Sequence, residues 1–423
     1  MGSLATDRLH NDAEAPFKVV VIGGSYAGLS AALNLLDLCE GRNARCSRGA
    51  ECSFKEPINV DITIVDERDG FYHLIGSPLA LALESYAEKA WVKFDDVAAL
   101  QVPNIHVVQG SVTKVDCAAK TATVKESARD EPLQLDYDYL VTASGLRRVW
   151  PVVPQSLKRK QYLFEAGDHI HSVSTADKGV VVVGGGAVGI EMAAELKLVQ
   201  PQTKVFLAHS RDKLLSAEPL PDECKDKALE LLREAGVEVL LEHRLQETRE
   251  VKGDDGKTRT EIVFTNGHTM LANNVIMAVS RSVPTTTFLP AEALDSEGYV
   301  KIQPSLQLPV STPNSSSHFA VGDLISWSGI KRCGAAMHEG YLAAVNAHKL
   351  MQQRLYGTEP AFQELKPIPP MIGLAVGKDA LSYGPGEGVQ SGARVAEIFF
   401  GDDLGFSICW NYLQLGISSN GSK

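Results

Sequence analysis

Two glycine-rich turns, each set between an apolar strand and an apolar helix, constrain this sequence more than any other feature. The first lies in "VVVIGGSYAGLSAALNL", residues 19–35, and the second lies in "VVVGGGAVGIEMAAEL", residues 181–196. Glycines at this spacing let the backbone turn tightly and approach a pyrophosphate, which then rests at the N-terminus of the following helix. One such motif is a weak signal, but two in the same context predict two dinucleotide-binding units.

The residue at the end of the second strand of each unit indicates which dinucleotide the turn binds. An acidic side chain about 20 residues past the last glycine hydrogen-bonds a ribose 2′-hydroxyl. Residues 40–57 are polar and aperiodic, and we interpret them as an inserted loop. When this loop is left out, the count from Gly28 reaches Asp66, with Glu67 as the neighbouring alternative.

The second unit has no carboxylate at the corresponding place. The same count from Gly189 reaches His209, which Ser210 and Arg211 follow. His209 and Arg211 could bind a 2′-phosphate as cations, although a solvated surface arginine is the alternative for Arg211. We therefore expect NADPH or NADH in the second unit. Because flavin is the usual acceptor of hydride from nicotinamide, we expect FAD in the first.

The order of apolar strands and helices predicts an α/β fold with two Rossmann-like domains and a C-terminal α+β interface domain. The stretch "TRTEIVFTNG" predicts a hairpin arm because it ends on Asn-Gly. Beyond about residue 360 the composition shifts to Pro and Gly with short apolar strands. The predicted boundaries are a disordered tail at 1–16, an FAD-binding domain at 17–150 and 281–355, an NAD(P)H-binding domain at 151–280 and the interface domain at 356–423.

Charge and hydropathy narrow the classes of partner. A net charge of −11 and a pI near 5.5 argue against a nucleic-acid-binding surface. No apolar run reaches the roughly 18 residues of a membrane-spanning helix. Gly2 and Thr6 fit the N-myristoylation pattern, with a plain disordered tail as the alternative, so membrane contact is expected only if Gly2 carries the lipid. We expect a cytoplasmic protein, with a membrane-associated or mitochondrial-surface location as the alternative.

The seven cysteines form no C-x-x-C pair, which favours reduced thiols. Cys39, Cys46 and Cys52 are close in sequence, but their spacing matches no zinc site. We expect no bound metal and interpret this cluster as a surface loop that carries thiols.

Four further stretches resemble the glutathione-reductase-like flavoproteins with two dinucleotide-binding domains: "IVDERDGFYH", "YLVTASG", "LAHSRDKLLSAEPLP" and "FAVGDLISW". From about residue 17 the chain is most similar to the apoptosis-inducing-factor-like group, which includes the ferroptosis suppressor protein and fungal relatives. Together with the turns, this resemblance implies FAD contacts at Gly23, Gly24, Ser25, Ala27, Gly28, Asp66, Glu67, Arg68, Val112, Ala143, Gly145, Gly322 and Asp323. It implies NAD(P)H contacts at Gly184, Gly186, Gly189, His209 and Arg211.

The resemblance also implies roles for individual residues around the flavin. Asp323 would hydrogen-bond the ribityl chain, and the backbone of Val112 would meet the adenine. Lys331 would lie close to the isoalloxazine, where a cation stabilises a reduced anionic flavin. An ordinary exposed lysine is the alternative.

Three further residues are candidates for the reaction itself. Glu191 matches a family glutamate near the junction of flavin and nicotinamide, and pairing with Lys197 or Arg147 is the alternative. His338 and Glu339 begin a helix that could reach the flavin, and a structural histidine is the alternative for His338.

The departures from the family pattern bear on the electron acceptor. The stretch "DERDGFYHLIGSP" holds no cysteine where disulfide reductases of this superfamily place one, so we expect electrons to pass directly from flavin to a small quinone-like acceptor. The stretch "CGAAMHEG" replaces a quinone-site signature, and Ser280 replaces a usual glycine. These changes favour the alternative of a biosynthetic flavoenzyme acting on a secondary metabolite, with His338 or Glu339 transferring a proton. A non-enzymatic signalling protein is a third hypothesis, and a homodimer is one option.

Overall fold

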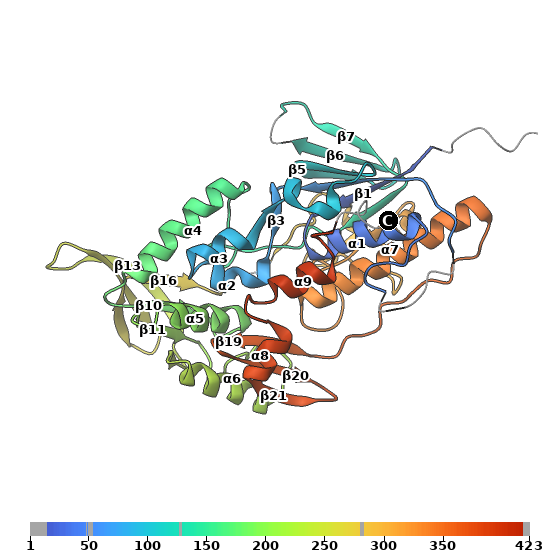
Figure 1. The fold of residues 1–423 in the computed structure, drawn as a ribbon. Coiled ribbons are helices and arrows are strands. Elements are labelled where there is room, and N and C mark those ends of the chain that lie inside the picture. The colour runs from blue at the N-terminus through green and yellow to red at the C-terminus, as the bar shows by residue number, and fades with distance from the viewer. Residues whose placement is uncertain (1–14, 48, 50–53, 127–128, 280–282, 418–423) are drawn as a thin grey trace, which may run out of the picture.

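A seven-stranded sheet forms the core of one half of the molecule in the computed structural model (Figure 1). The structure describes residues 15–47, 49, 54–126, 129–279 and 283–417. Across the sheet the strands are β18 (His318–Ala320), β8 (Tyr139–Thr142), β1 (Phe17–Ile22), β2 (Val60–Asp66), β5 (Ile105–Asp116), β6 (Thr121–Glu126) and β7 (Leu133–Asp136). The first five are parallel, and the outer part of β5 pairs antiparallel with β6. Central strands of this kind are buried on both faces, which is why β1 is an almost unbroken Val/Ile run.

Helix α1 (Tyr26–Cys39) packs on this sheet, and helix α7 (Cys333–Tyr356) lies beside α1 (Figure 1). Every residue of α1 is buried, because β1, β2 and β8 contact it on one side and α7 on the other. The Ser30 hydroxyl donates to the Met337 carbonyl at 2.6 Å and ties the two helices together. Gly340 is part of this contact, since a Cβ there would collide with the Ala27 carbonyl and lie 2.8 Å from the Cβ of Ser30.

The other half is built on a parallel sheet of four strands. Its order is β12 (Glu238–Leu240), β11 (Val205–Ala208), β10 (Val180–Val183) and β16 (Asn274–Met277), and helices α5 (Ala187–Val199) and α6 (Asp222–Glu234) pack beside it. The predicted hairpin is confirmed within a three-stranded antiparallel sheet of β13 (Leu245–Lys252), β14 (Thr258–Phe264) and β15 (Thr269–Ala272). Helix α4 (Arg159–Ser174) lies in a segment for which the sequence predicted no element.

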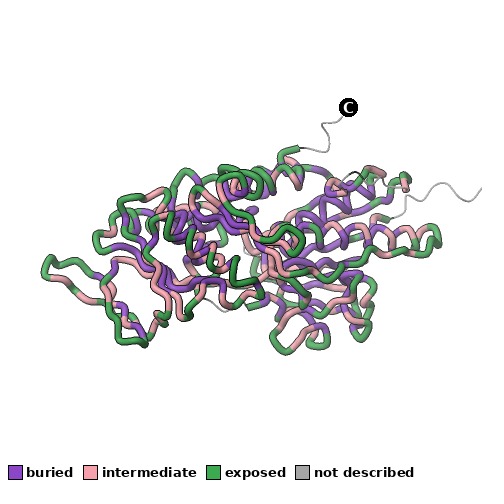
Figure 2. Tube along the Cα trace, turned by 90° about the horizontal axis from the view of Figure 1, so that it is seen from below, coloured by how far each residue is buried: buried purple, intermediate pink, exposed green. Residues whose placement is uncertain are grey.

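Short elements join the two halves. They are β3 (Gly70–Tyr72), β4 (Trp91–Lys93), α2 (Ser77–Ala80), α3 (Glu84–Ala90), β9 (Leu146–Arg147) and β17 (Val283–Pro284). The rings of Trp91 and Tyr162 stack with centroids 5.1 Å apart and so attach α4 to β4. Figure 2 shows that the buried chain runs through the middle of both halves.

The C-terminal segment is shared between the two halves. It forms β19 (Ile372–Val376), β20 (Asp379–Gly384), β21 (Gly388–Gly392), α8 (Ala393–Phe399) and α9 (Phe406–Tyr412). Strands β19 and β20 pack on α5 and α6 and belong to the apolar core of the second half. Helix α9 instead contributes Phe406 and Cys409 to the core of the first half. Among the described residues, the predicted interface domain therefore has no separate apolar core.

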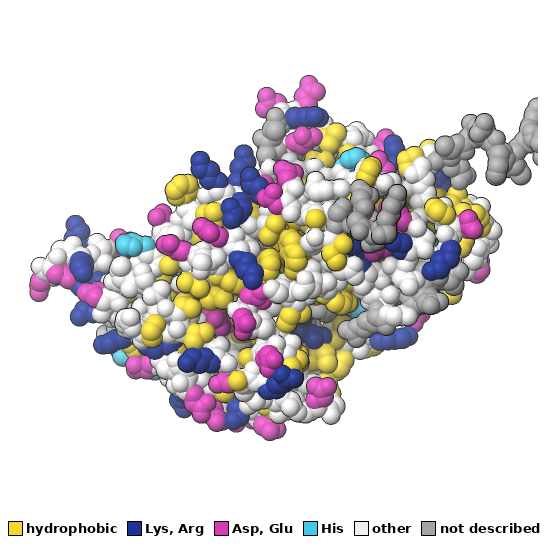
Figure 3. All heavy atoms as spheres, in the orientation of Figure 1, with side chains coloured by type: hydrophobic (Ala, Val, Ile, Leu, Met, Phe, Trp, Pro, Cys, Tyr) yellow, Lys and Arg dark blue, Asp and Glu magenta, His cyan; other side chains and the backbone are white. Residues whose placement is uncertain are grey.

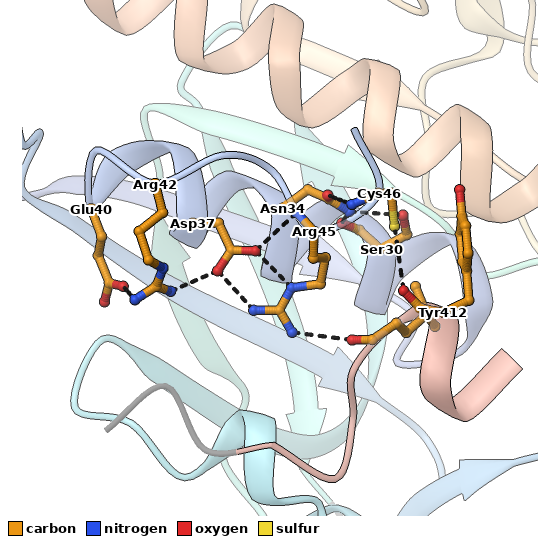
Figure 4. A network of polar contacts seen from close by, with 9 residues as sticks. Ser30, Asn34, Asp37, Glu40, Arg42, Arg45, Cys46 and Tyr412 are labelled. Carbon is orange, nitrogen blue, oxygen red and sulfur yellow. Dashed lines mark hydrogen bonds and ion pairs between the residues drawn. The ribbon is translucent and has the colours of Figure 1, made fainter. Parts of the chain in front are cut away.

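The first part of the inserted loop, residues 40–47, packs against α1 rather than extending into solvent. Residues 40–47 fold back on α1, where Arg45 forms an ion pair with the buried Asp37 at 2.8 Å (Figure 4). The Asn34 side chain accepts from the Cys46 backbone N–H at 2.9 Å, and Arg45 also donates to the Leu413 carbonyl at 3.1 Å. This network joins the loop to α1 and to the chain that follows α9.

The interpretation of the cysteine cluster as surface thiols was wrong for two of its members. Cys39 ends α1 and is 1 % exposed, and Cys46 is 4 % exposed. Sequence periodicity could not reveal this, because the burial of Cys46 comes from the network around Asp37. Cys52, Ser280 and Gly2 lie outside the described residues.

Replacing Gly340 by alanine tests the contact between α1 and α7. We expect Gly340→Ala to lower the free energy of unfolding by about 1–3 kcal/mol, because the added methyl group forces the helices apart. Denaturant unfolding measures this change. Gly167→Ala in α4, where a Cβ meets nothing within 4 Å, is the matched control and should be neutral or stabilising. Equal midpoints for the two variants would contradict the proposed packing role.

Candidate active site

In the first glycine turn, a side chain at Gly23 or at Gly28 would collide with the backbone. Gly23 has a φ of +108°, and a Cβ at Gly28 would overlap the Gly23 carbonyl oxygen. A Cβ at Gly23 would likewise meet the backbone of Ala143. Ser25 has a φ of −112° and is the N-cap of α1, so a side chain is allowed there, and its hydroxyl makes no capping bond. The N-terminal amides of α1 are therefore available to a pyrophosphate, as FAD requires.

Asp66 lies against this turn and Glu67 does not. The Asp66 carboxylate accepts from the Gly24 backbone N–H at 2.6 Å and from the Arg68 backbone N–H at 2.7 Å. Burial raises the pKa of Asp66. Glu67 instead accepts from Ser111 at 2.9 Å and from Arg147 at 3.0 Å. Of the two acids that the sequence offered, Asp66 has the position to meet a ribose.

Three other predicted FAD positions, Val112, Gly145 and Arg68, lie on the strands and loops that follow the first turn in the chain. Gln109 pairs with Asp66 across β2 and β5, so Val112 lies farther along β5, beyond the end of β2. Gly145 has a φ of +71°, and its carbonyl accepts from Thr285. The Arg68 guanidinium lies 5.9 Å from the ring centre of Trp91.

The turn at Gly322 and Asp323 meets the first glycine turn from the other side. A Cβ at Gly322 would lie 3.2 Å from the Cβ of Ala27, and the Gly322 N–H donates to the Glu339 carboxyl at 2.7 Å. Asp323 is 3.6 Å from Arg148, and burial raises its pKa. The two turns and α7 thus enclose one site.

Lys331 and Glu339 lie at this site, whereas His338 does not. The Lys331 ammonium donates to the Ile325 carbonyl at 2.7 Å, and burial lowers its pKa. Burial raises the pKa of Glu339 to about 7. His338 is exposed beside Tyr341, Cys46 and Ser47. Neighbouring helix residues face directions about 100° apart, which is why Glu339 is buried at the site while His338 is exposed; the catalytic role of His338 stays a prediction.

The second glycine turn repeats the geometry of the first. Gly184 has a φ of +126°, and a Cβ at Gly189 would overlap the Gly184 carbonyl oxygen. Gly186 is the N-cap of α5 with a φ of −80°. The amides at the start of α5 are therefore free to bind a second pyrophosphate.

His209 takes the structural place that Asp66 has in the first turn. Its Nδ1 accepts from the Gly185 backbone N–H at 3.1 Å, and its Nε2 lies 3.0 Å from the Ser216 hydroxyl. Burial lowers the pKa of His209, so the ring is neutral. This favours exposed Arg211 over His209 as the cation for a 2′-phosphate, and both contacts stay predictions.

Two glutamates of α5 lie where the second half meets β19, of which Glu195 is buried and Glu191 is half-buried. Glu191 accepts from the Ala375 backbone N–H at 3.2 Å and pairs with neither Lys197 nor Arg147. Burial raises the pKa of Glu191 to about 8 and that of Glu195 to about 7.

The sequence analysis missed a buried tyrosine–histidine pair at the site. The Tyr26 hydroxyl lies 3.0 Å from Nδ1 of His73, whose Nε2 lies 3.0 Å from the Leu404 carbonyl. Because a carbonyl only accepts, Nε2 carries the proton and Tyr26 donates to Nδ1. Burial lowers the pKa of His73 to about 4, which keeps the ring neutral. Tyr26 directly follows the Gly-Gly-Ser turn and His73 ends "DGFYH", so both were within motifs that the sequence had marked.

A family model described as pyridine nucleotide-disulphide oxidoreductase matches residues 17–340. The chain belongs to this family. Oxidoreductase OXR1 of Ajellomyces capsulatus is 52 % identical over 408 residues, which cover 95 % of this chain and 88 % of that protein. Ferroptosis suppressor protein 1 of Homo sapiens is 23 % identical over 398 residues, which cover 94 % and 95 %.

Solved structures agree on the fold. A water-forming NADH oxidase from Lactobacillus brevis bound to NADH has a TM-score of 0.62 and 18 % identity, and covers 86 % of this chain and 74 % of its own. A covalent putidaredoxin reductase–putidaredoxin complex also gives a TM-score of 0.62, with 22 % identity over 87 % and 81 %. The protein is an FAD-dependent NAD(P)H oxidoreductase with two Rossmann-like domains, as predicted. Within the described residues, no helix has the length and apolar character needed to cross a membrane.

The buried carboxyl of Glu195 should make stability depend on pH. Its pKa is raised from 4.5 to about 7, so its contribution to stability is complete below 4.5 and is lost as the pH rises toward 7. We expect unfolding free energies of Glu195→Gln to fall less than wild type between about pH 5 and about pH 7, by about 1 kcal/mol or more. Denaturant titrations at several pH values measure this, with exposed Glu234→Gln as control. Parallel curves for Glu195→Gln and wild type would refute it.

Proposed function

We propose that this chain passes hydride from NADPH to FAD, and then electrons to a small quinone-like acceptor, without a redox-active disulfide in that relay. The proposal is carried by the way both units adjoin the start of α7. Glu191 of the second unit and Asp323 of the first each interact electrostatically with Cys333, the first residue of α7. This arrangement supports direct transfer of hydride between the ends of the two dinucleotide sites.

The residues of the chain act mainly by positioning. FAD, when bound, supplies the hydride-accepting and electron-donating chemistry. Asp66, which accepts from the Gly24 N–H, would hold a ribose and Asp323 would hold a ribityl hydroxyl, while Glu339 fixes the Gly322 turn through its hydrogen bond. The Lys331 cation stabilises negative charge that develops at the site. Most of the rate enhancement comes from holding the reactants in line.

The small acceptor is supported by what occupies the usual place of a reactive cysteine. The stretch after Asp66 contains the buried rings of Phe71, Tyr72 and His73 and no thiol. Acidic and basic side chains are both scattered over the face in Figure 3, which differs from the basic field of a nucleic-acid-binding surface. The proposal includes a cytoplasmic location and no nucleic-acid partner.

The alternative of a biosynthetic flavoenzyme now depends on Glu339. With His338 exposed, Glu339 is the candidate that combines burial, a pKa of about 7 and proximity to Asp323. Such an enzyme would bleach the flavin with its substrate when no nicotinamide is present.

Coenzyme preference should follow the charge at position 209. We expect His209→Asp to lower the ratio of kcat/KM for NADPH to that for NADH at least about tenfold, because a carboxylate repels the 2′-phosphate. Arg211→Ala should lower it about tenfold, since a charge-assisted hydrogen bond contributes about 1.5–3 kcal/mol. Arg233→Ala, an exposed arginine of α6, is the control. An unchanged ratio in both variants would contradict NADPH binding at this place.

The activity itself is tested by mixing the holoenzyme with NADPH in a stopped-flow instrument. We expect the oxidised flavin absorbance to bleach at a rate that saturates with NADPH. Steady-state oxidation against a panel of quinones and dyes, with oxygen consumption followed in parallel, then ranks the acceptors. Flavin that stays oxidised with both NADPH and NADH would end this proposal.

A further inference from the structure

The loop between β12 and β13, residues 241–244, is held beside the end of β11, where the predicted coenzyme-selecting residues lie. The Glu242 backbone N–H donates to the Arg211 carbonyl at 3.0 Å. The His243 backbone N–H donates to the His209 carbonyl at 2.8 Å. Dinucleotides bind outside the carboxyl ends of parallel strands, and β11 and β12 are parallel neighbours. The β12–β13 loop therefore lies at the same edge of the sheet as the second glycine turn.

The backbone of this loop is held in a conformation that a glutamate rarely adopts. Glu242 has a φ of +59°, in the left-handed region where a Cβ is crowded. Such a conformation persists only where the surrounding contacts over-determine it, and it is found most often at ligand sites. The Glu242 carbonyl accepts from the Asn266 side chain at 3.2 Å, while its N–H binds Arg211. Hydrogen bonds therefore hold Glu242 from both sides.

A pair of histidines fastens the β12–β13 loop to the turn between β14 and β15. Nε2 of His243 lies 3.0 Å from Nδ1 of His268. Nδ1 of His243 lies 2.7 Å from the Leu241 carbonyl, which only accepts, so this nitrogen carries a proton. When both rings are neutral, Nε2 of His243 therefore accepts the hydrogen bond and Nδ1 of His268 donates it.

The histidine pair rests on the apolar core of the second half. The His268 ring stacks on Phe264 with centroids 5.7 Å apart, and the His243 ring meets Phe264 edge-on at 5.1 Å. Phe264 is fully buried and belongs to a cluster with Val183 of β10 and Ala208 of β11. The pair is thus fixed relative to the two strands that end at the predicted coenzyme site (Figure 1).

Arg211 has a charge that is available to a ligand. Among the described residues it forms no ion pair, whereas Lys213 in the same loop pairs with Asp222 at 3.1 Å. This loop is also fixed at its far end, where the Leu215 backbone N–H donates to the Gly185 carbonyl at 2.7 Å. Arg211 therefore lies between two anchored segments of backbone, with its guanidinium exposed.

We propose that the β12–β13 loop forms one wall of the NADPH site, and that His243 and His268 are positioning residues that hold this wall against Arg211. The inference rests on the proposed function, since it concerns the second coenzyme site. A loop that a ligand must first order costs conformational entropy, so the hydrogen bond between the two rings preorganises the site. The ligand class is a 2′-phosphorylated adenosine, because a guanidinium can bind a phosphate through two hydrogen bonds. NADPH carries this group and NADH lacks it.

The test measures dissociation constants of NADP⁺, NAD⁺ and 2′,5′-ADP for the oxidised holoenzyme by isothermal titration calorimetry. We expect His268→Ala to lower the preference for NADP⁺ over NAD⁺ about fivefold, because a hydrogen bond that orders the loop is lost. His268→Asn should restore the preference, since its amide nitrogen takes the place of Nδ1 and still donates to His243. His171→Ala, at an exposed histidine of α4, is the matched control. An unchanged preference in His268→Ala would overturn the proposal.

A double-mutant cycle shows whether the histidines act through Arg211. In an Arg211→Ala background, we expect His268→Ala to change the preference less than about twofold, because the cation that the loop positions is already absent. Equal effects of His268→Ala in the two backgrounds would indicate a general loss of loop structure and would refute the positioning role.

Hydrogen exchange of the wild type keeps the test decisive if His268→Ala folds poorly. Saturating 2′,5′-ADP should slow exchange at residues 241–244 at least about threefold, whereas residues 253–256, at the other end of the hairpin, should not change. Unchanged exchange at 241–244 would overturn the proposal. Wild type that binds NAD⁺ but not NADP⁺ would overturn the NADPH assignment together with this role. If NADPH bleaches the flavin and none of these effects is seen, only the role of the two histidines fails.

Discussion

The structure depends on a backbone contact with no room for a side chain. At the first turn the start of α1 lies so close to the end of β1 that a Cβ at Gly28 would overlap the Gly23 carbonyl. This approach turns the helix amides toward the ligand and brings Asp66 within 2.6 Å of the Gly24 N–H. A second close approach, at Gly340, lets α7 rest on α1, and the Gly322 turn then meets Ala27 beside the first turn. The contact of the first turn recurs at Gly184 and Gly189, so one steric rule builds both sites.

The two turns differ in charge rather than in shape. Asp66 and His209 both accept a hydrogen bond from the middle amide of their turn, which is a structural task that any acceptor can perform. A carboxylate at this place binds ribose hydroxyls and repels phosphate, whereas a neutral imidazole leaves room for either coenzyme. On the proposed function, a single side chain at the end of the second strand sets which dinucleotide binds and leaves the fold intact.

The sequence patterns predicted those features that depend on residues close together in the chain. The glycine turns, the strand that ends on Asp66 and the Asn266–Gly267 hairpin depend on residues close in sequence, and the fold class followed from them. Contacts between remote segments were not predictable. The pairing of Tyr26 with His73 depends on the position of β3, and the burial of Phe406 and Cys409 in the first core depends on how α9 returns to the first half. His338 was assigned by its neighbourhood in sequence, but helix phase turned it outward.

The C-terminal segment contributes to the apolar cores of both halves, and this has a mechanical consequence. Strands β19 and β20 belong to one core and α9 belongs to the other. The few residues around Leu404 connect them, so this connection would be stretched if the two halves moved apart. A hinge motion that separates the two halves would require α9 to leave the first core or β19 to lose its contact with α5. We therefore expect the molecule to unfold in one cooperative transition. A protease cut near Leu404 would let the two halves move relative to each other while each keeps its own apolar core.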